Sequence, residues 1–175
     1  DKKIMQTIIN FVRTKFPTVT IALFDLNHFF TPQLNSEIVL LTKLLAQTPT
    51  QIDLTPNFWQ QSAPLYKITL SNRLHTETIP PLLRALESLH LPNVAIVASD
   101  ETCLDITHSY AQKNVGVDYI LKHHHLSVSE TAAFGNGLND LSMFKAVGLA
   151  IAMQNSPTSL KQQADQITLS NEANG

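Results

Sequence analysis

The sequence predicts an α/β protein that contains a parallel sheet, and residues 131–153 are the first reason. A short apolar run, TAAF, is suited to a buried strand, and the turn Gly135-Asn136-Gly137 interrupts it. A helical pattern follows and ends at Gly148, and the run LAIAM is typical of a second strand. Strand, glycine turn, helix and strand is the local order of a parallel α/β sheet.

Composition gives the second reason and excludes several function classes. The chain has 175 residues, of which 43% are hydrophobic and 15% charged, which supports a packed core. Its net charge of -2, without a long basic run, argues against nucleic-acid binding. No apolar run approaches the ~20 residues of a membrane helix, and the single cysteine, Cys103, cannot form a disulfide within the chain. We expect a soluble cytoplasmic protein and, because the sequence does not start with Met, a piece of a longer one.

A change in the order of elements near residue 108 is the third reason. Before it, predicted strands and helices alternate irregularly and include a hairpin, whereas after it helices and strands alternate strictly. We predict a domain junction between residues 106 and 113, with one domain over residues 1–107 and the other over 108–175.

Apolar residues three or four positions apart predict helices, and short apolar or β-branched runs predict strands. In the first domain, these patterns predict a helix over 4–12 that ends before Pro17, strands over 19–24 and 28–31, and a helix over 35–46. A polar loop over 48–62 and a strand over 65–70 follow. The last predicted elements of this domain are a helix from an N-cap at Thr76 to Leu89 and strands over 94–98 and 104–107. In the second domain, the patterns predict a helix over 115–126 that buries Val117, Ile120 and Leu121, the elements of 131–153, a short helix that Ser156 and Pro157 open, and a strand over 166–169.

Polar residues suited to phosphate and metal chemistry lie next to two of these elements. Lys113 precedes the helix of 115–126, and Asn136, Asn139 and Asp140 follow the strand of 131–134. Ligands of parallel sheets bind at the carboxyl ends of strands. We expect the lysine and the turn to belong to neighbouring parallel strands, so that these side chains could meet at one edge of the sheet. Lysine supplies a positive charge for phosphate, and carboxamide and carboxylate oxygens suit Mg²⁺. On spacing alone, a surface lysine and a helix cap at Asn139-Asp140 explain the same residues equally well.

A family resemblance favours the first explanation. The segment FGNGLNDLSMFKAVGLAIAMQNSPTSLKQQADQITLSNEANG resembles the last conserved motif of haloacid dehalogenase (HAD) superfamily phosphatases of the Cof-type sugar-phosphatase branch, a G-D-x-x-N-D turn between a strand and a helix. Upstream, Lys113 and GVDYILKHHHLS resemble the third-motif segment of that branch. The segments LYKITLS and ASDETCLDIT resemble strands that bound its α/β cap domain.

The resemblance implies a fold and a function. It implies an α/β cap over residues 1–107 and the C-terminal part of a Rossmann-like core over 108–175. The intact protein would be an enzyme, a Mg²⁺-dependent phosphatase that transfers the phosphoryl group of a small metabolite, such as a sugar phosphate, to an Asp. Lys113 would be the catalytic lysine, Asn136 and Asp140 the metal-side residues, and Asn139 a neighbour of phosphate or metal. This chain would lack the first and second motifs and be inactive alone.

Two departures from the family pattern keep alternatives open, one at Asn136 and one in the first motif, which is missing from its place near the amino terminus because the cap begins at once. Asn136 stands where Asp is usual, and an amide oxygen can bind Mg²⁺ but brings no charge. A degenerate HAD fold that binds a ligand or a partner without turnover is therefore one alternative. In the other, a capless HAD enzyme, Asp25 in FDLNHFFT is the nucleophile and Ser71 in ITLSNR binds phosphate. Against the second, Asn27 cannot act as a general acid, and both segments also fit strands of the cap.

Overall fold

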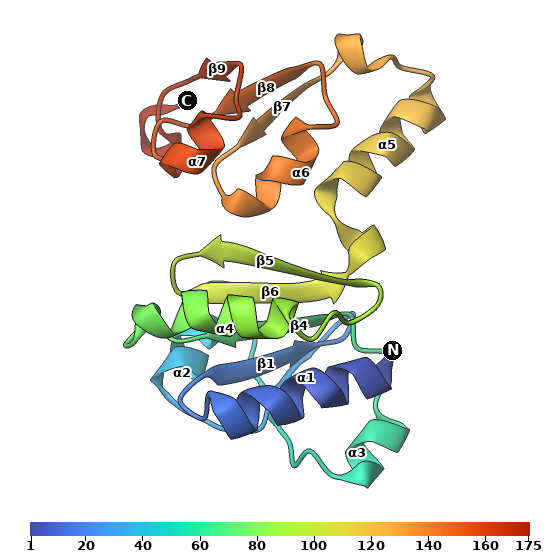
Figure 1. The fold of residues 1–175 in the computed structure, drawn as a ribbon, viewed down its shortest axis with the longest axis vertical. Coiled ribbons are helices and arrows are strands. Elements are labelled where there is room, and N and C mark those ends of the chain that lie inside the picture. The colour runs from blue at the N-terminus through green and yellow to red at the C-terminus, as the bar shows by residue number, and fades with distance from the viewer. The chain divides into compact units, whose positions relative to one another are not determined.

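The computed structural model describes residues 1–175, which divide into two compact units, Asp1–His108 and Ser109–Gly175. We call them the N-terminal unit and the C-terminal unit. Figure 1 shows that both combine helices with a sheet, so the prediction of an α/β fold is confirmed. Every helix is too short or too polar to cross a lipid bilayer.

The N-terminal unit is built on a six-stranded sheet in the order β3-β2-β1-β4-β6-β5. Neighbouring strands are antiparallel except for β2 and β3, which are parallel. Its helices and strands are α1 (Lys2–Lys15), β1 (Thr20–Phe24), β2 (Phe29–Thr31), α2 (Ser36–Leu45), β3 (Thr50–Gln51), α3 (Pro56–Gln61), β4 (Lys67–Ser71), α4 (Ile79–Glu87), β5 (Val94–Asp100) and β6 (Cys103–His108).

The main core of this unit lies between the sheet and the helices α1 and α4, which lie on the same face of it (Figure 1). Alternate residues of the central strands point into this core, among them Leu23 and Ile68, which are cross-strand partners. Helix α2 packs on the opposite face, where Ile38 joins Ala22 and Phe29 in a smaller cluster. Because successive residues of a strand point to opposite faces, a slip of one residue in β1 would exchange Leu23 of the main core with Ala22 of the smaller cluster, and this difference specifies the register.

The C-terminal unit contains a three-stranded parallel sheet in the order β7-β8-β9. In chain order its elements are α5 (Lys113–His124), β7 (Ala132–Gly135), α6 (Leu141–Phe144), β8 (Leu149–Ala152), α7 (Thr158–Lys161) and β9 (Gln166–Ile167). The predicted alternation of helices and strands is therefore confirmed. Its core is small, and Phe144 and Leu160 pack there against alanines of β7 and β8.

Two predictions for the N-terminal unit were wrong. The segment 48–62 is not a plain loop, because it contains β3 and α3. Helix α3 begins with Thr55 as an N-cap, whose side chain accepts from the N–H of Phe58, and Pro56 follows in its first turn. Thr76 does not cap the next helix: it begins a 3₁₀ turn, Thr76–Thr78, and α4 starts at Ile79, where two prolines occupy the first turn.

Two predictions for the C-terminal unit were also wrong. Ile120 is 52% exposed, and Leu121 is the buried residue of α5. Ser156 does not cap α7, because its side chain is buried and its hydroxyl donates to the carbonyl oxygen of Gly135 at 3.3 Å. This bond connects the segment after β8 to the end of β7, which the spacing of the sequence could not show.

Candidate active site

Lys113 and Asp140 are in direct contact within the C-terminal unit. Lys113 is the first residue of α5, and Asp140 lies after β7 in the 3₁₀ turn Leu138–Asp140. The Nζ atom of Lys113 donates to Oδ1 of Asp140 and forms an ion pair with it. The carboxylate is 4% exposed, whereas the lysine side chain is 50% exposed. An ammonium group has three N–H donors, so Lys113 can donate to Asp140 and still present donors to an anion in solvent.

The other oxygen of Asp140 holds the turn after β7. Its Oδ2 accepts the backbone N–H of Asn136 at 2.8 Å and that of Gly137 at 3.0 Å. One carboxylate therefore fixes both the lysine and the backbone of the glycine turn. Such charge-assisted bonds are shorter and stronger than bonds between neutral groups, so we expect this turn to be well ordered.

These contacts also explain the protonation state of Asp140. Burial by itself would raise the pKa of the carboxyl group, but the hydrogen bonds from Lys113, Gly137 and Asn136, together with the charge of Lys113, lower it below its usual value. Asp140 is therefore a carboxylate at neutral pH, and it keeps a negative charge beside Lys113.

Gly135 lets the turn pack closely against Asp140. A Cβ atom at this position would lie 2.7 Å from Cβ of Asp140 and 2.8 Å from an edge atom of the Phe144 ring. The carbonyl oxygen of Gly135 accepts from the N–H of Met153 at 2.9 Å, in addition to the hydroxyl of Ser156. The end of β7 is therefore held by its packing against Asp140 and by hydrogen bonds from Met153 and Ser156. The polar turn begins there, at the carboxyl edge of the sheet.

The structure brings Lys113 to this edge in a different way than we predicted. We expected the lysine to follow a strand next to β7 in the parallel sheet. The strand that precedes it in the chain, β6, instead belongs to the antiparallel sheet of the N-terminal unit. Lys113 reaches Asp140 because α5 packs against α6, which follows Asp140.

The two asparagines of the turn are placed beside this pair in the chain, and neither is deeply buried. Asn136 is exposed and directly follows Gly135 at the end of β7. Asn139 is half-buried in the 3₁₀ turn that ends at Asp140. The sequence did not indicate a role for the backbone N–H of Asn136. In the structure it helps to hold the turn, because it donates to the carboxylate of Asp140.

The turn fits one side of a magnesium site. Asn136 can supply an amide oxygen, whereas both oxygens of Asp140 already accept hydrogen bonds. No group of three or more His, Cys, Asp or Glu side chains among residues 1–175 is arranged to hold a metal ion. Mg²⁺ binds about six oxygens in an octahedron, often including several waters and substrate oxygens. The residues of this turn are therefore suited to supply one or two of those ligands.

The structure does not bring together Asp25 and Ser71, the nucleophile and the phosphate ligand of the capless alternative. Their strands, β1 and β4, are antiparallel, and the pairing joins Phe24 to Lys67 and Thr20 to Ser71. Asp25 follows one end of β1 and Ser71 pairs with the other, so about five residue steps of ~3.4 Å each separate them. The Asp25 carboxylate also accepts the N–H groups of the turn that follows it, at 2.8 and 2.6 Å.

Comparison with known proteins identifies the family. The family of haloacid dehalogenase-like hydrolases matches residues 1–175. A relative from Haemophilus influenzae, named as a putative phosphatase, is 34% identical over 84 residues, which are 48% of this chain. The aligned region spans 32% of that relative, so the match covers about a third of its length.

Solved structures share the fold. A haloacid dehalogenase-like hydrolase from B. subtilis has a TM-score of 0.83 and 22% identity, and the alignment covers 100% of this chain and 68% of that one. The HAD subclass IIB sugar phosphatase BT4131 has a TM-score of 0.76 and 19% identity, with coverage of 100% and 64%. At these identities, the solved structures show a shared fold. The family match covers residues 1–175. The chain belongs to the haloacid dehalogenase-like hydrolase family.

Proposed function

We propose that the C-terminal unit carries the lysine and metal-side half of a phosphatase active site. The observation that carries this proposal is the contact between Lys113 and Asp140, in which the same carboxylate also binds the N–H groups of the turn at Asn136 and Gly137. A half-exposed cation held at the carboxyl edge of a parallel sheet is suited to a phosphoryl group. The named phosphatase among the relatives supports the same reaction.

In this proposal each residue has a distinct part. Lys113 donates to an oxygen of the bound phosphoryl group and opposes its charge, while Asp140 keeps the ammonium in place. The amide oxygen of Asn136 would bind Mg²⁺, with Asn139 beside it and Asp140 as the supporting carboxylate. When bound, Mg²⁺ would neutralise charge that develops on the transferred group. The nucleophilic Asp would come from a part of the intact protein outside these 175 residues.

We further propose that the N-terminal unit is the α/β cap and that the C-terminal unit is part of the Rossmann-like core. The separation of an antiparallel-rich sheet from a parallel one, at His108, supports this assignment. The substrate of the intact cytoplasmic enzyme would be a small phosphorylated metabolite. A sugar phosphate is the first class to test, because one protein of the same fold is named as a sugar phosphatase.

The proposal is tested by turnover of p-nitrophenyl phosphate by the intact protein, with Mg²⁺ and after its removal by EDTA. We expect turnover that requires the metal. The absence of turnover at any Mg²⁺ concentration, with the protein folded, would contradict the enzymatic proposal. A panel of sugar phosphates then identifies the preferred class.

A specific observation favours one second candidate, a HAD fold that binds a phosphorylated ligand or a partner without turnover. Asn136 replaces a charged residue at the position that the family pattern gives to a metal ligand, and it is exposed. The variant Asn136→Asp separates the two candidates in the intact protein. If the wild type is an enzyme, the variant changes its Mg²⁺ requirement, whereas a binding protein stays inactive in both forms and still binds inorganic phosphate. An intact D-x-D-x-T motif upstream of Asp1 would also favour the enzyme.

A further inference from the structure

Strand β5 is an edge of the six-stranded sheet, and its first five residues, 94–98, lack the usual protection of an edge. It is last in the strand order, and its run of seven residues, VAIVASD, contains neither proline nor lysine. Its only irregularity is a register shift between Ala98 and Asp100. Natural edge strands are commonly protected by lysine, proline, short length or a bulge, so the part of β5 before its bulge offers unpaired backbone groups to a further strand.

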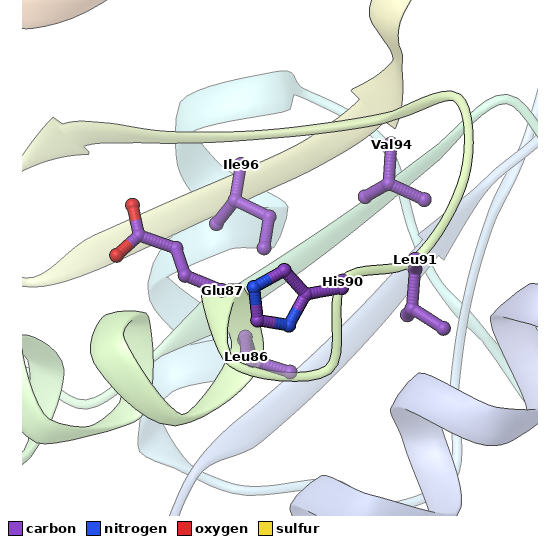
Figure 2. A pocket seen from close by; sticks show the side chains of 6 residues that line it. All are labelled: Leu86, Glu87, His90, Leu91, Val94 and Ile96. Atoms are coloured by element: carbon purple, nitrogen blue, oxygen red, sulfur yellow. The ribbon is translucent and has the colours of Figure 1, made fainter.

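A pocket lies beside this edge, between the end of α4 and β5 (Figure 2). Its volume is about 240 Å³, below the range of roughly 300–1,000 Å³ that is typical of sites for whole small molecules. The pocket is therefore better suited to one side chain. Its apolar lining consists of Leu86, Leu91, Val94 and Ile96, which surround the ring of His90 (Figure 2).

The polar groups at this pocket are hydrogen-bond acceptors. Nδ1 of His90 lies 2.7 Å from the carbonyl oxygen of Ser88, so Nδ1 carries a proton and Nε2 of the neutral ring is an acceptor. The exposed carboxylate of Glu87 also lines the pocket. An occupant that complements this rim must bring donors, and a cationic donor suits it best.

The charges around the edge point the same way. Asp100 and Glu101 are exposed at the end of β5, so with Glu87 three carboxylates flank the strand. Helix α4 carries one exposed cation, Arg84, one turn before Glu87. A second copy of this chain would bring the same acidic groups and the same acceptors, which makes it a poorer complement than a basic segment.

We propose that the edge of β5, together with the pocket between α4 and β5, binds an extended segment of another protein that adds a strand to β5. Its backbone would pair with the free edge, an aliphatic side chain would fill the pocket, and a lysine or arginine two residues away would meet Glu87 on the same face. This mode of recognition takes affinity from backbone bonds and specificity from side-chain pockets. The proposal concerns a different surface from the Lys113 site and does not depend on phosphatase activity.

The probe is the peptide acetyl-TKTLTKT-amide, in which the leucine and both lysines share one face in either direction of pairing. We expect saturable shifts in the backbone ¹⁵N–¹H NMR signals of residues 94–100 when it is added to the chain. Replacing its leucine by serine, or changing Glu87→Lys in the protein, should weaken binding about tenfold. The control Glu77→Lys makes the same charge change on an exposed residue of the same unit, and should leave binding unaltered.

Three results would overturn the proposal: no shift in β5 with the peptide at millimolar concentration, equal binding by Glu87→Lys, or shifts in β5 that depend on protein concentration alone. The last result would show that a second copy occupies the edge. Because Glu87 and Glu77 are both exposed, thermal unfolding of each variant should match the wild type and exclude a folding defect.

Discussion

Removal of the Asp140 side chain should loosen the turn after β7 more than any other single truncation in the C-terminal unit. Asp140→Ala deletes three hydrogen bonds: one from Lys113 and two from the N–H groups of Asn136 and Gly137. The ion pair contributes less than ~1 kcal/mol, because Lys113 is half-exposed and water can solvate it. The two backbone bonds to the carboxylate contribute about 1.5 kcal/mol each, at the lower end of the range for bonds to a charged group.

The expected loss is therefore about 3 kcal/mol, or roughly a hundredfold change in the equilibrium for local opening of the turn. Hydrogen exchange measures it directly at the amides of Asn136 and Gly137. Their exchange should accelerate about a hundredfold in Asp140→Ala, and about tenfold in Asp140→Asn, which keeps one acceptor oxygen. The matched control is Asp118→Ala, which removes an exposed carboxylate from α5 in the same unit.

The reasoning would be refuted if the two amides exchanged within about twofold of the wild-type rate in Asp140→Ala. The variant would then behave like the control Asp118→Ala. That result would mean that the turn is held by its own backbone and by its contacts with β8, and that Asp140 does not organise it.

Three further predictions concern the same unit and the chain alone. The pKa of Asp140 is lowered in the folded state, so its carboxylate should stabilise the fold fully above the usual pKa of about 3.9. This contribution should be lost as the pH falls through the lower folded-state pKa. Thermal unfolding between neutral and strongly acid pH should show this loss in the wild type and not in Asp140→Asn. Gly135→Ala should lower the free energy of unfolding by about 1–3 kcal/mol, because its Cβ would overlap Asp140 and Phe144, whereas Gly116→Ala, whose Cβ meets nothing within 4 Å in helix α5, should be neutral or stabilising. The 175-residue chain alone should show no appreciable phosphatase activity; turnover that Asp25→Asn abolishes would contradict this and favour Asp25 as the nucleophile.

The elements that sequence predicted best are those whose pattern is local. Helix α1 and strand β8 carry a clear apolar period or run, so their burial follows from their own residues. Strand β7 forms where it was predicted, but only its alternate residues are buried, and Phe134 is 59% exposed. Helix α3 was missed although its start signals, Thr55 and Pro56, are present. Its six residues are too few to show a period, and the surrounding segment is polar.

The candidate site shows a similar limit. The residue types of Lys113 and Asp140 indicated phosphate and metal chemistry, but no spacing rule shows that one carboxylate binds both the lysine and two N–H groups of the turn. Ser156 had the form of a helix cap and is instead buried against Gly135, because β7 and β8 are neighbours in the sheet. Such contacts depend on packing between segments that are distant in the sequence.

The central claim is that Lys113 lies in the active site of a Mg²⁺-dependent phosphatase. It is tested most directly by the kcat/KM for p-nitrophenyl phosphate of the intact protein and of Lys113→Ala, each with saturating Mg²⁺. We expect Lys113→Ala to lose at least about a hundredfold in kcat/KM, equivalent to roughly 3 kcal/mol of transition-state stabilisation, while an exposed lysine of α5 in the same unit, Lys122, can be changed to alanine without effect. Equal activity of Lys113→Ala and the wild type would contradict the account.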